Sequence, residues 1–125
     1  MPLVCDLTDI ENIKEAVQQA VNTMGRIDIL INNAGVYPAS PILEVTEKQF
    51  NLVIDINLKG LFFITQAVVQ TSMLPNNYGR IVNISSSDGK NPGKGVSIYG
   101  AAKAGVISLT KSFAGELAGY NINAN

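Results

Sequence analysis

The sequence predicts an α/β protein built on a partial doubly wound parallel sheet, with helices and sheet in a three-layer αβα arrangement. Aliphatic strand candidates at residues 27–31 and 80–85 are almost uninterrupted, which is typical of strands that helices cover on both faces. Helical patterns lie between the strand candidates, so that strand and helix alternate along the chain. The 125 residues contain no repeat and no linker, and we therefore expect a single domain over residues 1–125.

The first half of the chain begins with a short apolar run at residues 2–5, which we interpret as a strand. Thr8 and Glu11 fit a capping box at the start of a helix, because each side chain can satisfy a backbone donor beside the other. Apolar residues then recur at helical spacing until Gly25, which ends the helix. The aliphatic strand at 27–31 follows, and a loop rich in Asn, Gly and Pro comes after it.

The second half opens with another capping pattern, Thr46 to Gln49, at the start of a helix that runs to about residue 73. Apolar residues cover most of the circumference of this helix, which indicates burial on more than one side. A turn leads to the strand at 80–85, and a helix rich in small residues is expected over 97–117. Residues 121–124 are expected to begin a last strand.

The composition excludes several classes of protein. The net charge is -1 and no basic block occurs, so we expect no nucleic-acid partner. No apolar run approaches the ~18 residues that a membrane span needs, and nothing at the start reads as a signal peptide, so no membrane partner is expected. Cys5 is alone, which excludes an internal disulfide and fits a cytoplasmic location.

The absence of histidine narrows the chemistry further. It excludes Ser-His-Asp and Cys-His nucleophile systems as well as zinc sites built on histidine, and we expect no metal site. Acid–base chemistry must therefore come from Tyr, Lys, Asp, Glu or Cys.

Four polar residues in the second half are candidates for such chemistry. Tyr99 and Lys103 stand one helical turn apart, so their side chains share a helix face. A lysine ammonium beside a tyrosine hydroxyl stabilises the phenolate, which makes the tyrosine a usable proton donor or acceptor. Each residue alone has an ordinary interpretation: Tyr99 and Lys103 as a surface pair, Ser86 as a turn residue. Asn57 interrupts an aliphatic helix, where a buried amide without partners costs ~1–3 kcal/mol.

Several motifs occur in the order and spacing of one enzyme family. They are Asn32-Asn33-Ala34-Gly35 after a strand, Asn57 within Ile56-Asn57-Leu58, Ser86 thirteen residues before Tyr99, Tyr99 with Lys103 four residues later, and the segment Cys5 to Asp9. With these motifs the whole chain resembles the short-chain dehydrogenase/reductase family. The resemblance implies a Rossmann-like, NAD(P)-binding fold.

The resemblance also implies an oxidoreductase that transfers a hydride between NAD or NADP and a small-molecule alcohol or ketone. In such enzymes Tyr99 exchanges a proton with the substrate oxygen, and Ser86 hydrogen-bonds that oxygen. Lys103 holds the nicotinamide ribose and stabilises the Tyr99 phenolate, while Asn57 anchors a water that relays protons. The implied cofactor-binding residues are Asp6, Leu7, Asn33, Ala34, Gly35, Tyr99 and Lys103.

Two surfaces follow from the same resemblance. The helices at 47–73 and 97–118 are implied to form the interface of a homodimer or homotetramer. Tyr37 and the loop at 88–96 are expected to line the substrate pocket.

Two parts of the family pattern are not matched: the Gly-rich nucleotide-binding turn with the second strand, and the segment that covers the substrate. We therefore interpret the sequence as a truncated family member, in which residues 2–5 move sideways to pair directly with residues 27–31. Alone, the chain is expected neither to bind dinucleotide well nor to fold stably. The alternative function is a catalytically inactive fragment that acts as an oligomerisation or interaction module. The substrate, and the choice between NAD and NADP, stay open.

Overall fold

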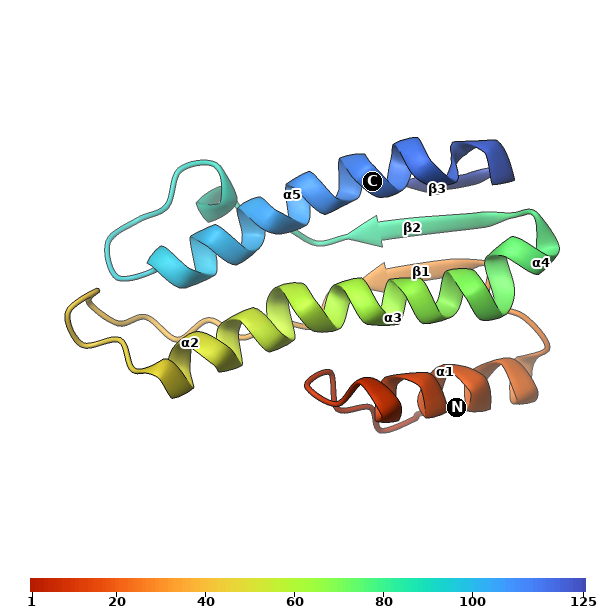
Figure 1. Cartoon of the computed structure of the whole chain (residues 1–125), viewed down its shortest axis with the longest axis horizontal. Helices are drawn as coiled ribbons and strands as arrows, with labels where there is room; N and C mark the ends of the chain where they lie inside the picture. The colour runs from red at the N-terminus through yellow and green to blue at the C-terminus, as the bar shows by residue number, and fades with distance from the viewer.

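Three short parallel strands and a set of long helices make up the structure, a computed structural model that describes all 125 residues (Figure 1). In chain order the elements are α1 (Ile10–Met24), β1 (Ile29–Asn32), α2 (Glu47–Ile54), the π-helical η1 (Asp55–Gly60), α3 (Leu61–Val68), the π-helical η2 (Val69–Met73), α4 (Leu74–Asn76), β2 (Gly79–Asn83), the 3-10 turn η3 (Ser87–Gly89), α5 (Ser97–Leu117), the 3-10 turn η4 (Ala118–Tyr120) and β3 (Ile122–Ala124).

The strands are hydrogen-bonded in the order β1-β2-β3, and both pairs are parallel. Ile29 pairs with Arg80, and Gly79 pairs with Ile122, so that the three strands point the same way. In Figure 1 the arrowheads of β1 and β2 point toward the end of the molecule where α5 begins. The expected partial doubly wound parallel sheet is confirmed.

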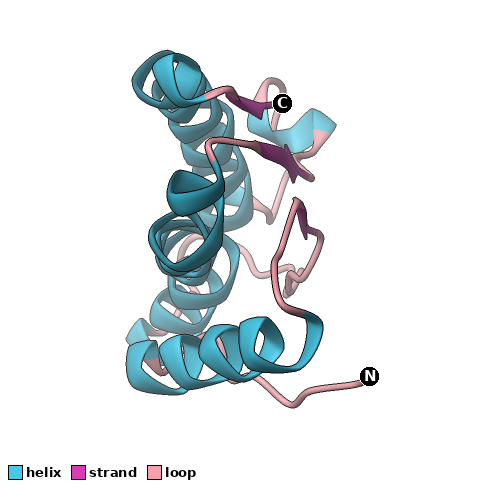
Figure 2. Cartoon of the chain, turned by 90° about the vertical axis from the view of Figure 1, so that its right-hand side faces the viewer, coloured by secondary structure: helices cyan, strands magenta, loops and turns pink.

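The helices cover one face of this sheet. The run from α2 to α4 and the helix α5 lie along that face, and α1 packs beside α3 (Figure 2). The core between them contains the buried side chains Ile13, Val17, Ala67, Val68, Val69, Met73, Ile81, Ile122 and Ala124.

The other face of the sheet has no helical cover within residues 1–125. Ile29, Ile31, Val82 and Ile84 lie on it with exposed side chains. Residues 1–125 therefore supply two layers, the sheet and one layer of helices. They do not supply the second helical layer of the expected αβα sandwich.

The long helix expected from residue 47 continues to Asn76 through two π-helical segments. Its predicted start is confirmed, since Thr46 and Gln49 form the full capping box. By length and composition this helix could cross a membrane, but so could the core helix of a soluble protein, and 44% of its most apolar stretch is buried inside the protein. The prediction that no apolar run approaches ~18 residues concerned uninterrupted runs, and polar and charged residues interrupt this helix.

The N-terminal segment departs most from expectation. Residues 2–5 form no strand and pair with nothing, so both the strand and its sideways pairing with 27–31 were wrong. The backbone of Leu7 instead lies on the long helix, where a Cβ on Gly60 would stand 2.7 Å from the Leu7 carbonyl oxygen. A groove of about 220 Å³ lies between this segment and β1, so residues 2–5 have no strand beside them.

The first helix also begins differently from the predicted capping box. Asp9, not Thr8, is the N-cap, and its carboxylate accepts from the backbone N–H groups of Glu11 and Asn12. The hydroxyl of Thr8 instead donates to the carboxylate of Asp6 at 2.8 Å. An ionised carboxylate is the stronger acceptor of the two, which explains the shift by one residue.

Candidate active site

Tyr99 and Lys103 lie on the first turns of α5, and Asn33 to Gly35 and Ser86 follow the carboxyl ends of β1 and β2, which Figure 1 shows pointing to the same end of the molecule. Parallel strands present their carboxyl ends at one edge of a sheet, which is where open α/β folds bind ligands. The loop after β1 supplies Asn33 to Tyr37, and the turn after β2 supplies Ser86.

Asn57 lies inside the π-helical segment η1 and is buried, with 1% of its surface exposed. Its Nδ2 donates to the carbonyl oxygens of Val53 and Val36, each at 3.0 Å, and its Oδ1 accepts from the N–H of Val36 at 3.3 Å. The expectation that this amide must find partners is confirmed. Asn57 thereby ties the long helix to the loop after β1, and a π-helical turn at this position is a common feature of functional sites.

Gly35 brings two of the predicted residues together. A Cβ at this position would stand 2.6 Å from Asn57 Oδ1 and 3.7 Å from Lys103 Nζ. Only glycine allows the backbone to come this close, because a carbon–oxygen separation below 3.0 Å forces something to move. The exposed backbone of residues 33–35 therefore runs directly past Asn57 and Lys103.

Lys103 is the charged centre of the site. Its side chain is buried, with 4% of the residue exposed, and Nζ donates to the Ile84 carbonyl oxygen at 2.8 Å. Burial lowers the pKa of this ammonium from its ordinary value of 10.5. An ammonium has three donors, so donors remain for the hydroxyl groups of a ligand.

Tyr99 lies half-buried on the same helix, and Lys103 Nζ is 5.6 Å from the centre of its ring. The predicted helix face shared by Tyr99 and Lys103 is thus present. The Tyr37 ring meets the Tyr99 ring in a T-shaped arrangement, with centres 4.6 Å apart and planes at 87°.

Ser86 occupies the turn between β2 and α5. Its Oγ accepts from the N–H of Asp88 at 3.1 Å and caps η3, and Oγ lies 3.5 Å from Asp88 Oδ2. The turn packs against the helix of the candidate residues, since a Cβ on Gly89 would stand 2.8 Å from the Lys103 carbonyl carbon. The structure thus brings the Ser86 turn to Lys103, but it records no direct contact between Ser86 and Tyr99.

Sequence reasoning missed Asp88 as a neighbour of Ser86. Asp88 also accepts from the N–H of Gly93 at 3.4 Å and closes the loop that follows. The available signal was the spacing Ser-x-Asp, in which a serine N-cap is followed by an acid in the first turn.

A buried polar network supports the site from below, and the sequence analysis did not identify it. Asn32 Nδ2 donates to Thr65 Oγ1 at 2.9 Å and to Asn83 Oδ1 at 2.8 Å. Asn83 Nδ2 in turn donates to Thr110 Oγ1 at 2.9 Å. The network links β1 and β2 to α3 and α5, so it fixes the strand ends that carry the candidate residues.

Asp6, one of the implied cofactor-binding residues, is held by hydrogen bonds from its neighbour Thr8. The N–H and hydroxyl of Thr8 both donate to Asp6 Oδ1, at 2.9 and 2.8 Å, and these bonds lower the pKa of the Asp6 carboxyl. Asp6 is therefore ionised at neutral pH and keeps its second oxygen as an acceptor. Burial, and then the charge of Asp6, raise the pKa of the Cys5 thiol, which supports a packing role for this cysteine.

The groove of about 220 Å³ tests whether a dinucleotide fits these residues. Leu3, Leu7 and Leu30 line it together with Asn33 and Ala34, so its walls are mainly apolar. The Asp6 carboxylate is not part of this lining, so the fit of a base rests on the free acceptor of Asp6 and on the apolar side chain of Leu7. Residues 1–125 offer no binding site for the pyrophosphate of a dinucleotide, because they contain no Gly-rich turn.

Comparison with known proteins agrees with this geometry. A family model described as short chain dehydrogenase matches residues 1–125. The chain is 45% identical over 124 residues to 3-oxoacyl-(acyl-carrier-protein) reductase FabG of Thermotoga maritima, and this match covers 99% of the chain and 50% of the relative. It is also 45% identical over 121 residues to 2-dehydro-3-deoxy-L-rhamnonate dehydrogenase (NAD(+)) of a Sphingomonas species, covering 96% of the chain and 48% of the relative.

Solved structures give the same result. The crystal structure of NAD+-bound xylitol dehydrogenase matches with a TM-score of 0.93 and 38% identity, over 98% of this chain and 47% of that one. The chain thus spans about half the length of the relatives it matches. With all 125 residues matched, the chain belongs to the short-chain dehydrogenase family and is an oxidoreductase by descent.

Proposed function

We propose that residues 1–125 form part of one nucleotide-binding domain of an NAD(P)-dependent dehydrogenase that interconverts an alcohol and a ketone. The observation that carries the proposal is the convergence of Asn57 and Lys103 on the exposed backbone at Gly35, with Tyr99 beside Lys103. The names of the relatives, which are dehydrogenases and reductases, support the same reaction class.

The cofactor would contact three parts of the chain. Asp6 and Leu7 hold the base, the exposed backbone of residues 33–35 passes along the ribose, and Lys103 donates to ribose hydroxyls. A bound nicotinamide dinucleotide supplies or accepts the hydride. The choice between NAD and NADP stays open, because the family's second strand, whose end distinguishes the two cofactors, is not matched in residues 1–125.

The side chains of the site handle the proton. The Tyr99 hydroxyl gives its proton to the substrate oxygen during reduction and takes it back during oxidation. The Ser86 hydroxyl donates to the same oxygen, and its 3.5 Å separation from Asp88 Oδ2 is long enough that little is lost when it turns toward substrate.

Lys103 supplies the charge that stabilises the Tyr99 phenolate. Lys103 Nζ lies 5.6 Å from the centre of the Tyr99 ring, and a positive charge at such a range favours the ionised form of an acidic group. Asn57 acts by holding Gly35 and Val36 in place, and the remaining lone pair of its Oδ1 is available to a water in the proton path.

The test is Tyr99→Phe in the complete natural protein. We expect turnover to fall by more than a hundredfold while the affinity for the cofactor changes little, since the ring remains and only the proton donor is lost. Tyr120→Phe, at an exposed residue of η4, is the matched control. Turnover of the Tyr99→Phe protein within tenfold of the parent would contradict the assignment of Tyr99, whereas a parent without turnover would favour the alternative, an inactive interaction module.

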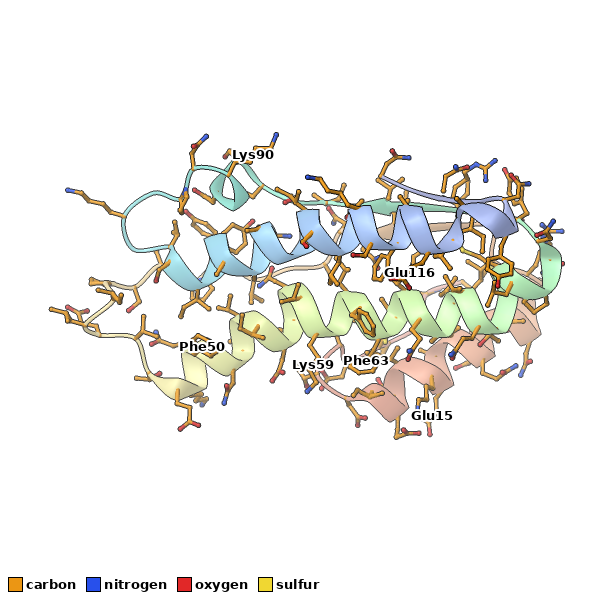
Figure 3. All side chains as sticks on the ribbon, turned by 45° about the horizontal axis from the view of Figure 1, so that its top comes forward. Glu15, Phe50, Lys59, Phe63, Lys90 and Glu116 are labelled. Carbon is orange, nitrogen blue, oxygen red and sulfur yellow. The ribbon has the colours of Figure 1, made fainter.

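We further propose that the protein is a homodimer or homotetramer joined through the long helix and α5. A groove of about 410 Å³ lies between these helices, lined by apolar side chains such as Phe62, Phe113 and Leu117 together with polar ones such as Gln66 and Gln70. Glu116, labelled in Figure 3, lies at the same groove. An apolar surface on exposed helices often marks the place where another protein binds, and we propose that a second copy of this protein covers it. Sedimentation at micromolar concentration tests the proposal, and a strict monomer contradicts it.

We also propose that the protein is cytoplasmic and that it binds neither nucleic acid nor a membrane. The low net charge of -1 and the lone Cys5 support them.

A further inference from the structure

Ser85, the residue before the candidate Ser86, makes a bond that the chemistry described above does not use. Its Oγ donates to the backbone carbonyl oxygen of Lys103 at 2.9 Å, across 18 positions of the chain. In the opposite direction, Lys103 Nζ donates to the carbonyl oxygen of Ile84 at 2.8 Å. Two neighbouring residues that follow β2 therefore hold Lys103 at both ends, one at its backbone and the other at its ammonium.

The sheet fixes the place from which these two bonds start. The N–H of Ile84 donates to the carbonyl oxygen of Asn32, the last residue of β1, at 3.0 Å, so strand pairing continues through Ile84. The side chain of Ser85 lies on the helical side of the sheet, as its bond to α5 shows. Because residues 84 and 85 are held in this way, the position of Lys103 is set relative to β1 and β2.

The docking of α5 on the sheet does not depend on Ser85. Ala102 and Val106 on this helix are fully buried, and Thr110 Oγ1 accepts from the amide of Asn83 at 2.9 Å. The Lys103 carbonyl lies inside α5 and has two lone pairs, so it can accept from Ser85 in addition to a helical N–H. Loss of the Ser85 hydroxyl would therefore leave no buried backbone group without a partner, and its effect should fall on Lys103 rather than on folding.

The ammonium of Lys103 has to be held because its stem is long and flexible. Nζ lies 5.6 Å from the centre of the Tyr99 ring, and a Cβ on Gly35 would stand 3.7 Å from it. A lysine side chain has four rotatable carbons and loses much of its rotamer freedom when its ammonium is fixed. A catalytic group keeps its geometry only when neighbouring hydrogen bonds and packing hold it, and small displacements lower the rate.

We propose that Ser85 is a positioning residue of this site, which acts through Lys103. Its hydroxyl fixes the Lys103 backbone beside β2, so that the ammonium can keep one donor on Ile84 and use the others for the cofactor ribose and for Tyr99. Ser85 itself contacts neither substrate nor cofactor. The inference rests on the proposed function, in which Lys103 serves both cofactor binding and proton transfer.

Kinetics of Ser85→Ala and Ser85→Thr in the complete natural protein test the proposal. The loss of one hydrogen bond predicts a fall in kcat and a rise in the KM for the cofactor of about two- to tenfold each in Ser85→Ala. The KM for the ketone should change less, because Lys103 does not contact the substrate. Ser85→Thr keeps the hydroxyl and should stay within about twofold of the parent. Ser87→Ala, which removes an exposed hydroxyl from the same run of serines, is the matched control.

Several outcomes overturn the proposal. They are unchanged kcat and cofactor KM in Ser85→Ala, an equal loss in Ser85→Thr, and an equal loss in Ser87→Ala. Thermal unfolding of each variant adds one more: a Ser85→Ala protein that does not fold, or that loses only stability, would show that the hydroxyl serves the fold and not the site.

A double-mutant cycle with Lys103→Met tests whether Ser85 acts through the ammonium. Fluorescence titration gives the Kd for whichever of NADH and NADPH the complete protein binds. Ser85→Ala should weaken this affinity about two- to tenfold in the parent, but by less than about twofold in the Lys103→Met background. Equal weakening in both backgrounds rejects the inference.

The same cycle separates the inference from the proposed function. Undiminished affinity and turnover in Lys103→Met alone would reject the role proposed for Lys103, whatever Ser85→Ala does. A clear loss in Lys103→Met together with an unchanged Ser85→Ala would leave the proposed function in place and reject only the role of Ser85.

Discussion

Gly35 is the residue at which the loop after β1, the long helix and α5 meet. Gly35→Ala should destabilise the protein by about 1–3 kcal/mol, because its Cβ would stand 2.6 Å from Asn57 Oδ1 and break the bonds between Asn57 and Val36. Gly115→Ala is the matched control, since a Cβ there meets nothing within 4 Å and should stabilise α5 by about 0.5–1 kcal/mol. Urea unfolding measures both, and equal effects in the two variants would contradict the close approach.

Lys103 gives a prediction about pH. Its pKa is lowered in the folded protein, so the charged form is disfavoured there relative to the unfolded chain, whose value is 10.5. Below the folded pKa, the protein carries the full cost of burying the charged lysine. As pH rises from the folded pKa to 10.5, the free energy of unfolding increases, because the unfolded chain then holds more protons than the folded protein.

The stability of the parent relative to Lys103→Met should therefore increase with pH over that window and become flat above it. Lys111→Met removes an exposed lysine of the same helix and should show no such trend. Urea unfolding from pH 8 to 11 provides the measurement. A parent that loses stability against Lys103→Met as pH rises would reverse the sign and reject the burial argument.

The sequence predicted the role of single residues where their partners are close in the chain or where their sequence neighbours are all of one kind. The aliphatic neighbours of Asn57 already indicated an amide in need of partners, and the structure supplies them. Thr65 and Asn83 were missed because the partners of this network lie 27–51 residues apart, and no local pattern records a contact at that separation. The geometry at Ser86 also depends on where a distant helix packs against its turn.

Elements were predicted well where their signal is periodic and capped. The helix expected over 97–117 has those bounds, and the capping box at Thr46 is present. The strand predicted at residues 2–5 was wrong because an apolar run becomes a strand only beside a partner, and a groove separates this run from β1. Strand ends moved by a few residues for the same reason, since pairing with neighbours defines them.

At the scale of elements, the buried network predicts how β1 and α3 hold together. Thr65→Val keeps the shape but removes the hydroxyl that accepts from Asn32 and donates to the Leu61 carbonyl. One N–H of Asn32 is then buried without a partner, so the protein should lose about 1–3 kcal/mol of stability. Thr65→Ser keeps the hydroxyl and should lose about 1 kcal/mol or less, for one methyl group. Thermal unfolding compares the two, and an equal loss would mean that packing rather than the hydrogen bond matters.

At the scale of the whole chain, residues 1–125 cover one face of the sheet with helices and leave the other bare (Figure 2). The sequence could not reveal this, because strands are equally aliphatic whether or not these residues supply their cover. The bare face carries Ile29, Ile31, Val82 and Ile84, and the edge of β1 has no neighbouring strand. Exposed aliphatic strands with an open edge associate with one another. The architecture therefore favours association of any isolated form of these residues.

Residues 1–125, prepared alone, should aggregate at micromolar concentration and bind neither NADH nor NADPH with micromolar affinity. The first expectation follows from the bare face, and the second from the missing donors for a pyrophosphate, which Gly-rich turns at helix N-termini provide. Replacing Ile31 and Val82 together by Thr should raise solubility, since both side chains are exposed at 61% and 36%, whereas Ile81→Thr, at a residue 1% exposed, should lower it. Light scattering and fluorescence titration measure the two properties. A monomeric, folded chain that binds either dinucleotide at micromolar concentration would show that two layers and three strands are enough for this fold to stand and to hold its cofactor.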